Sequence, residues 1–172
     1  RPLQQNLANP ACLELYFAMG RGYQKNGLDI TAMEMTKWFD TNYHYLVPEF
    51  DAQLKFTLLS KKCVHEFEEA KRLGIHTKPV LIGPLSFLIL GKIKDPKLNN
   101  RILLQQLLPV YIQLLAELQN AGATWVQIDE PCLVTDLAAT DKELYADAYT
   151  KINEAVPDLK ILLTTYFGGL QD

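Results

Sequence analysis

The chain has 172 residues, of which 48% are hydrophobic and 22% charged, a composition of a globular domain rather than of a disordered or fibrous protein. Its formal net charge of -3 argues against nucleic acid or an anionic membrane as a partner, because both are bound through concentrated positive charge. The three cysteines are odd in number and far apart, and no apolar run reaches the ~18 residues of a membrane-spanning helix, so we expect a cytoplasmic protein.

The first third of the chain predicts a helix, a strand and an aromatic loop. Apolar residues recur at helical spacing over residues 11–19, and Gly20 and Gly22 are suited to end that helix. Residues 33–40 are interpreted as a strand that carries Lys37 near its end, and residues 41–57 are aromatic and irregular.

From residue 60 onward the pattern becomes regular. Ser60 is suited to cap a helix that stops at Gly74, and residues 78–82 form a short apolar strand. Helical sequence then begins at Asn99 or Asn100 and continues to residue 120. Because Pro109 lies inside it, we expect a kink or two abutting helices.

The last third of the chain predicts two more strands, residues 125–128 and 160–165. The helix between them is expected to start at a capping box made of Thr140 and Glu143. Strands thus recur near residues 36, 80, 126 and 162, with helices between the later ones. This alternation predicts parallel strands covered by helices, an α/β fold.

Two architectures fit this pattern, an open doubly wound sheet and a closed (β/α)8 TIM barrel. The segment Gly20-Arg21-Gly22 lacks the third glycine of the dinucleotide-binding fingerprint and does not follow a strand. A full barrel needs about 250 residues, so four strands in this chain predict about half of one. We expect residues 1–172 to form part of a single barrel domain with no internal boundary.

Polar residues collect where the predicted strands end, which is the ligand edge in both architectures. Asp129 and Glu130 follow one strand and either hydrogen-bond an amine or hydroxyl of a ligand, act as acid and base, or close a turn and pair with local backbone or a basic side chain. Lys37 either holds a carboxylate or phosphate or is a solvated lysine. His44 is either an acid, a base or stacking surface, or a histidine packed in the aromatic loop.

No metal site is expected within this chain. Cys63 and His65 lie two residues apart on a predicted helix, so their side chains point in different directions. No Cys/His pair has the spacing of zinc ligands, and no Gly-x-Ser-x-Gly elbow supports a hydrolase nucleophile. We therefore assign no catalytic residue.

The sequence around Lys37 resembles the amino-terminal half of the cobalamin-independent methionine synthase family, the 5-methyltetrahydropteroyltriglutamate–homocysteine methyltransferases. The resemblance begins with Glu-Met-Thr-Lys-Trp-Phe-Asp-Thr-Asn-Tyr-His-Tyr at residues 34–45 and continues to Phe50. It extends through residues 79–84, 108–111, 125–131 and 163–167.

The resemblance implies an enzyme of two face-to-face barrels, of which this chain is about half of the amino-terminal one. The whole enzyme would move a methyl group from 5-methyltetrahydrofolate polyglutamate to homocysteine, without cobalamin, and a zinc ion would hold the homocysteine sulfur. The zinc ligands would lie in the missing carboxyl-terminal barrel. Because the chain also begins with Arg1 rather than methionine, we expect a fragment that is inactive alone.

The resemblance assigns a role to few residues of this chain. Lys37 matches the lysine that contacts the folate substrate from this half. Asp129 matches the aspartate of an Ile-Asp-Glu-Pro motif, which is expected to be structural or vestigial here. Further residues of the expected ligand face, with no individual role, are Asp40, Asn42, His44 and Glu130.

Two other functions remain open at this point. In the first, the chain is a non-catalytic module that binds folate or another carboxylate on a half-barrel scaffold. In the second, the chain is an independent enzyme of the related decarboxylase-like barrels, with Asp129 as its acid. Four strands cannot close a barrel, which argues against this second function.

Overall fold

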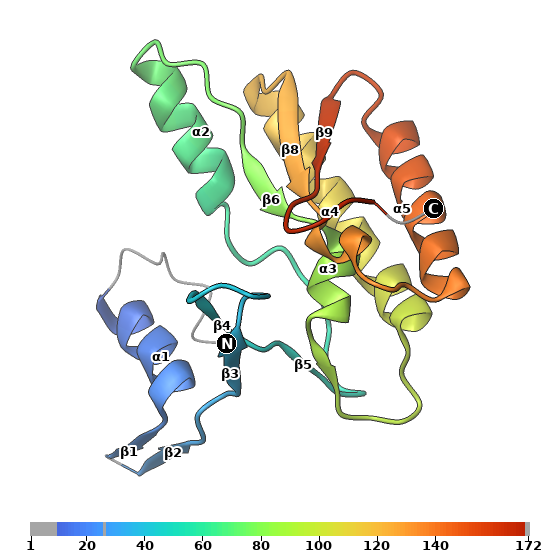
Figure 1. Cartoon of the computed structure of the whole chain (residues 1–172). Helices are drawn as coiled ribbons and strands as arrows, with labels where there is room; N and C mark the ends of the chain where they lie inside the picture. The colour runs from blue at the N-terminus through green and yellow to red at the C-terminus, as the bar shows by residue number, and fades with distance from the viewer. Residues whose placement is uncertain (1–9, 26, 171–172) are drawn as a thin grey trace. The chain divides into compact units, whose positions relative to one another are not determined.

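The computed structural model describes residues 10–25 and 27–170, which fall into two compact units (Figure 1). The first unit ends at Glu49 and the second begins at Phe50. The expectation that residues 1–172 belong to one barrel domain with no internal boundary stays a prediction. The two units are described separately below.

Among its described residues, the first unit contains one helix and two antiparallel hairpins. The predicted amino-terminal helix is confirmed as α1 (Pro10–Arg21). It ends at Gly22, whose φ of 75° is a left-handed conformation that glycine adopts without strain. The strands of the hairpins are β1 (Tyr23–Lys25) with β2 (Leu28–Ile30), and β3 (Met35–Lys37) with β4 (His44–Leu46).

The predicted strand at residues 33–40 is therefore wrong in length and in its pairing. Only β3 is extended, and its antiparallel partner β4 follows after a short turn. Trp38 N donates to Tyr43 O at 2.7 Å, and Phe39 takes a positive φ of 51° in the turn. Closing such a short loop costs less conformational entropy than pairing with a strand more than forty residues away, so local pairing prevails.

The second unit is built on a three-stranded parallel sheet in the order β6-β8-β9 (Figure 1). The strands are β6 (Val80–Ile82), β8 (Trp125–Asp129) and β9 (Lys160–Thr164), and all three lie within about two residues of their predicted positions. Phe50, the end of β5 (Glu49–Phe50), accepts a 2.8 Å hydrogen bond from Lys94 N, next to β7 (Lys92–Ile93).

Helices connect the three parallel strands. The segment between β6 and β8 contains α3 (Pro84–Ile89) and α4 (Asn100–Ala121), and the segment between β8 and β9 contains the short 3-10 helix η2 (Pro131–Val134) and α5 (Ala139–Ala155). A further helix, α2 (Lys62–Arg72), precedes the sheet. Parallel strands need such crossovers, because the chain must return to the same edge before the next strand.

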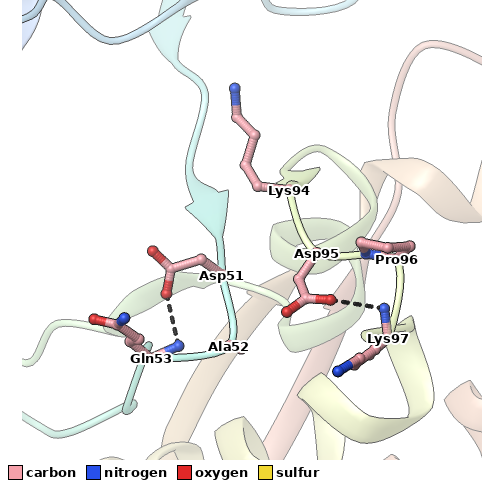
Figure 2. Close-up of a pocket in the computed structure, with 7 residues that line it drawn as sticks. All are labelled: Asp51, Ala52, Gln53, Lys94, Asp95, Pro96 and Lys97. Atoms are coloured by element: carbon pink, nitrogen blue, oxygen red, sulfur yellow. Dashed lines mark hydrogen bonds between the residues drawn. The ribbon is translucent and has the colours of Figure 1, made fainter.

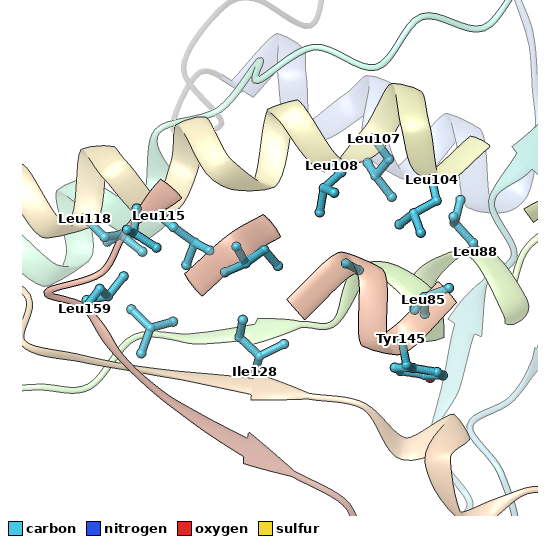
Figure 3. Packing of buried hydrophobic residues seen from close by; sticks show 14 of the residues in the cluster. Leu85, Leu88, Leu104, Leu107, Leu108, Leu115, Leu118, Ile128, Tyr145 and Leu159 are labelled. Atoms are coloured by element: carbon cyan, nitrogen blue, oxygen red, sulfur yellow. The ribbon is translucent and has the colours of Figure 1, made fainter. Parts of the chain in front are cut away.

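The core of this unit lies between the sheet and the two long helices (Figure 3). The helical spacing of leucines in α4 brings one face of the helix onto β8 and α5. The buried leucines of α4 are Leu103, Leu104, Leu107, Leu108, Leu115 and Leu118. Val126 and Ile128 of β8 meet them with no exposed surface.

The opposite face of the sheet is partly bare in this chain. Val80, Trp125 and Leu162 keep 54%, 44% and 40% of their surface exposed. In parallel register, Val80 pairs with Gln127 and Gln127 with Leu162, so these side chains lie on one face. The α/β class is confirmed, but the described residues form three parallel strands instead of four, and a partial barrel stays a proposal.

Two of the three residues predicted to cap a helix do not occupy the N-cap position. Asn99 caps α4 as expected, since its side chain accepts from Ile102 N at 2.9 Å. Helix α2 begins one residue later than expected, with Lys61 at the N-cap position, but Ser60 Oγ still accepts from Lys62 N, the first residue of the helix, at 3.2 Å. Helix α5 starts at Ala139, so Thr140 already lies in its first turn and forms no capping box.

Pro109 does not divide α4 into two helices. The structure has a single helix of 22 residues with Pro109 inside it. The proline ring is exposed to solvent, and buried leucines on both sides fix the helix to the core. The packing of these leucines outweighs the loss of one backbone donor, about 3 kcal/mol for a proline in a helix interior.

Candidate functional site

The hairpin of β3 and β4 presents Lys37 and His44 side by side. They are paired across the two strands, so their side chains emerge on the same face, and both are exposed. His44 Nδ1 lies 3.1 Å from Asn42 O. His44 is therefore not packed inside the aromatic loop, and that alternative is wrong.

The turn that joins the two strands is held by local contacts. Thr41 Oγ1 donates to Trp38 O at 2.6 Å and accepts from Tyr43 N at 3.1 Å. The Trp38 ring meets the rings of Phe39 and Tyr45 edge to face, each at a centroid distance of 5.3 Å. Asp40 and Asn42 are exposed in this turn, so the hairpin brings together four of the predicted site residues: Lys37, Asp40, Asn42 and His44.

Asp129 and Glu130 form no acid–base pair. Asp129 ends β8 in register with Ile82 and Thr164, and its Oδ1 accepts from Gln127 Nε2 at 2.8 Å. The Glu130 side chain is fully buried and is bonded to helices α3 and α5. Because successive side chains of a strand alternate between its two faces, the neighbouring carboxylates point to opposite sides of the sheet. The alternative in which they act together as acid and base is wrong.

Hydrogen-bond donors surround the Glu130 carboxylate. Its Oε2 accepts from Ser86 N at 2.8 Å and from Tyr145 Oη at 3.3 Å, while Oε1 accepts from Tyr149 Oη at 2.8 Å and, at 3.4 Å, from Leu85 N. Burial raises the pKa of Glu130 above its ordinary value, against the opposing effect of hydrogen bonds from the Ser86 hydroxyl and from Ser86 N, Tyr149 and Leu85 N. Burial, together with the negative charge of Glu130, also raises the pKa of both tyrosines.

Gly83 is required where the chain leaves β6, because the Glu130 carboxylate occupies the space of a side chain. A Cβ added at Gly83 would lie 1.9 Å from Glu130 Cδ. Tyr111 of α4 donates to Ile82 O at 2.8 Å just before this turn. The carboxyl end of β6 is thus hydrogen-bonded to α4 and to the end of β8.

Sequence reasoning missed the cluster around Glu130, although one signal was present. Val126, Ile128 and Glu130 alternate along the chain and therefore share the buried face of β8. Tyr145 and Tyr149 lie four residues apart on α5, which places them on one side of that helix. The sequence does not show that the end of β8 and helix α5 lie in contact in the fold.

A shallow hollow beside β5 and β7 shows no features of a binding site (Figure 2). Asp51 accepts from Gln53 N and Asp95 from Lys97 N, each at 2.8 Å, so both carboxylates stabilise their own turns. Its remaining lining residues are Ala52, Lys94 and Pro96.

No metal site can be assigned within residues 10–25 and 27–170. No three His, Cys, Asp or Glu side chains in these ranges are grouped so that they could hold an ion. The residues present therefore do not fit a zinc centre, and the expectation that zinc is bound elsewhere stays a prediction. Within the same ranges, no helix combines the length and the apolarity needed to cross a membrane.

The chain matches the family described as "Cobalamin-independent synthase, N-terminal domain" over residues 4–172. The chain belongs to this family. The match covers both the hairpin that carries Lys37 and the parallel sheet that ends at Asp129. The resemblance noted in the sequence is thereby confirmed.

Curated relatives in this family carry the name 5-methyltetrahydropteroyltriglutamate–homocysteine methyltransferase. The protein of Cytophaga hutchinsonii is 54% identical over 156 residues, which are 90% of this chain and 20% of that protein. The protein of Xylella fastidiosa is 56% identical over 167 residues, or 96% of this chain and 22% of that protein. The chain spans about a fifth of the length of the curated relatives that it matches.

A solved structure supports the fold. It is described as a putative vitamin-B12 independent methionine synthase from Listeria monocytogenes, and its TM-score to this chain is 0.52 at 20% sequence identity. The superposition covers 71% of this chain and 42% of the other. At this identity the likeness concerns the arrangement of strands and helices alone.

Proposed function

We propose that this chain is part of the amino-terminal barrel of a methyltransferase that makes methionine. The whole protein would transfer a methyl group from 5-methyltetrahydropteroyltriglutamate to homocysteine. The single observation that carries this proposal is 54–56% identity over at least 90% of the chain to proteins with that name. We infer the cytoplasm as its location from its cysteine content, with Cys63 and Cys132 both free thiols.

Lys37 is proposed to contact the polyglutamate tail of the folate. Its side chain is exposed on a hairpin held by the Thr41 turn and by aromatic contacts around Trp38, so the backbone that carries the lysine has a defined conformation. A polyglutamate tail is a string of carboxylates, and a lysine offsets this charge with charge-assisted hydrogen bonds. Asp40, Asn42 and His44 are proposed as neighbouring residues of this ligand face.

The parallel sheet of the second unit is proposed as a segment of the barrel wall. Its strands follow one another in chain order, as they do in a (β/α)8 barrel, and α4 and α5 cover one face. The bare face with Val80, Trp125 and Leu162 would then point into the barrel and be covered by strands outside this chain.

The zinc ion and the homocysteine site are proposed to lie in the carboxyl-terminal barrel, and no cobalamin is expected. The described residues offer Lys37 and His44 as ligand-binding groups and hold no cluster suited to zinc. We therefore propose that the chain alone has no methyltransferase activity.

A second candidate is a module that binds a carboxylate ligand without catalysis. The observation that favours it is the exposed pairing of Lys37 with His44, since two nitrogen-bearing side chains on one face can bind a carboxylate with no further machinery. Asp129 as the acid of a decarboxylase-like enzyme has no comparable support, because its carboxylate accepts from Gln127 and the adjacent Glu130 points away.

The reading frame around this segment and a methyl-transfer assay together test the proposal. We expect the frame to continue into a segment with a His-x-Cys pair and a later cysteine suited to zinc. The intact protein should form methionine from the triglutamate donor without cobalamin, and the 172-residue chain should not. A frame that stops at Asp172, or an intact protein without transfer, would favour the binding module.

A further inference from the structure

The Glu130 carboxylate connects parts of the second unit that are far apart in the sequence. It accepts from the first turn of α3 through Ser86 N, 44 residues away, and from α5 through Tyr149 Oη, 19 residues away. The side chain is fully buried, so these protein donors take the place of water.

The chemistry of the cluster requires an acceptor at this position. Two backbone N–H groups and two tyrosine hydroxyl groups all point at the two oxygens of one carboxylate. An amide in the same place would turn an NH2 group toward one of these donors. One donor would then lose its partner inside the core, which is a costly arrangement.

The backbone at Asp129 and Glu130 connects the same cluster to both neighbouring strands. Gly83 N donates to Asp129 O at 2.7 Å, and Glu130 N donates to Thr164 O at 2.9 Å. A movement of Glu130 would therefore displace the ends of β6 and β9 together with β8. These ends form the carboxyl edge, where parallel α/β sheets bind their ligands.

Asp129 takes its orientation from this arrangement. Its side chain emerges on the bare face of the sheet, opposite Glu130, and its Oδ1 holds Gln127 Nε2 at 2.8 Å. Gly83 adds a steric constraint, because the turn after β6 passes so close to Glu130 that a Cβ has no room.

We propose that Glu130 is a positioning residue: its buried carboxylate fixes the turn at Gly83–Ser86 and the end of β8, so that Asp129 is held at the carboxyl edge. The role belongs to Glu130 and not to its motif neighbour Asp129. It concerns the contacts of the second unit and does not depend on the proposed methyl transfer.

Hydrogen exchange and side-chain amide resonances of the 172-residue chain test this role. The variant is Glu130→Gln, which keeps the shape of the side chain and changes the acceptor. The matched control is Glu143→Gln on α5, where the side chain is 72% exposed and forms an ion pair with Arg101 at 3.6 Å. The reporters are the Ser86 amide, the Gln127 side-chain amide and, as a remote probe of the core, the Leu115 amide.

In Glu130→Gln, we expect Ser86 to exchange about tenfold faster or more, because an NH2 group replaces one of the two acceptor oxygens and the donors around it must rearrange. The Gln127 side-chain resonance should shift, while Leu115 should be affected much less. Glu143→Gln should change none of the three. A general loss of stability would instead speed Ser86 and Leu115 by the same factor.

The proposal is overturned if Glu130→Gln leaves Ser86 and Gln127 as they are, or if Ser86 and Leu115 accelerate equally. Should Glu130→Gln not fold, Tyr149→Phe removes one donor and keeps the carboxylate. It should give a smaller local acceleration at Ser86 and a smaller shift at Gln127. An unchanged Ser86 and Gln127 in Tyr149→Phe would then contradict the role.

Discussion

The two units of this chain hold their functional groups in different ways. In the first unit, Lys37 and His44 lie opposite each other because a turn a few residues long folds β4 back onto β3. In the second unit, Glu130 reaches Ser86 across 44 residues, through a sheet and two helices that must all be in place. The first arrangement rests on local contacts and the second on the whole core.

This difference predicts that the two units respond to separate sets of substitutions. The chain has two tryptophans, Trp38 in the hairpin of the first unit and Trp125 in β8 of the second. Variants that keep one tryptophan, with Trp125→Phe or Trp38→Phe, therefore report on one unit at a time.

Leu115→Ala should have the largest effect and should act on the second unit. Leu115 is fully buried between α4, the sheet and α5, and removing such a leucine costs about 2–5 kcal/mol. Denaturant unfolding followed by Trp125 should show this loss. Leu73→Ala is the control, because Leu73 is 72% exposed, and an equal loss there would contradict the account of the core.

Gly83→Ala should destabilise the second unit by about 1–3 kcal/mol, since the new methyl group would overlap the Glu130 carboxylate. Gly169→Ala is the control, because no atom lies within 4 Å of its added Cβ. In a double-mutant cycle with Glu130→Ala, the two losses should not add, with a coupling of about 0.5–3 kcal/mol. Strict additivity would mean that the two positions do not meet.

The stability difference between the wild type and Glu130→Gln should grow as the pH falls from 7 toward 4. The folded pKa of Glu130 is raised, so the folded state binds its proton at a higher pH than the unfolded state. The stabilisation of the folded state by this bound proton is complete below the ordinary glutamate pKa of about 4.3, and it is lost as the pH rises through the folded pKa of Glu130.

The other titratable groups of the cluster do not interfere in this range. They are Tyr111, Tyr145, Tyr149 and Cys132, all with a pKa raised by burial, so they stay protonated. Urea unfolding of both proteins at a series of pH values measures the difference. A constant difference over this range would mean that Glu130 does not titrate as its burial requires.

Thr41→Val should have the smallest effect, about 0.5–1.5 kcal/mol, and should act on the first unit. The substitution removes the hydroxyl that donates to Trp38 O and accepts from Tyr43 N. The emission of Trp38 during unfolding should report the loss, while Trp125 should not. Thr140→Val, at an exposed position of α5, serves as the control, and a response of Trp125 to Thr41→Val would contradict the separation of the two units.

The sequence predicted the elements of the second unit well, because their signals lie within each element. The leucine spacing in α4 and the short apolar strands β6, β8 and β9 fall where periodicity placed them. Helix starts were less certain, because Ser60 and Thr140 compete with neighbouring residues for the first turn. A capping residue stabilises a helix end by only about 1 kcal/mol, so the packing of the helix decides at which residue it begins.

The candidate site was predicted only where it is local. Lys37, Asp40, Asn42 and His44 form one continuous motif, and the hairpin keeps them together. The sequence did not predict the pairing of β3 with β4, because the residue pattern of one strand does not determine with which other strand it pairs. Glu130 was grouped with Asp129 by adjacency, although the alternation of Val126 and Ile128 assigns it to the buried face.

The most direct test of the central claim is the contribution of Lys37 to binding of the folate tail in the intact protein that contains this chain. Lys37→Met should raise KM for the triglutamate donor about tenfold, because a charge-assisted contact to a carboxylate is lost, and should affect a monoglutamate donor less. Lys25→Met removes the same charge from an exposed position of β1 and should change neither value. If Lys37→Met behaves like Lys25→Met with both donors, Lys37 does not bind the tail and this account of the first unit is wrong.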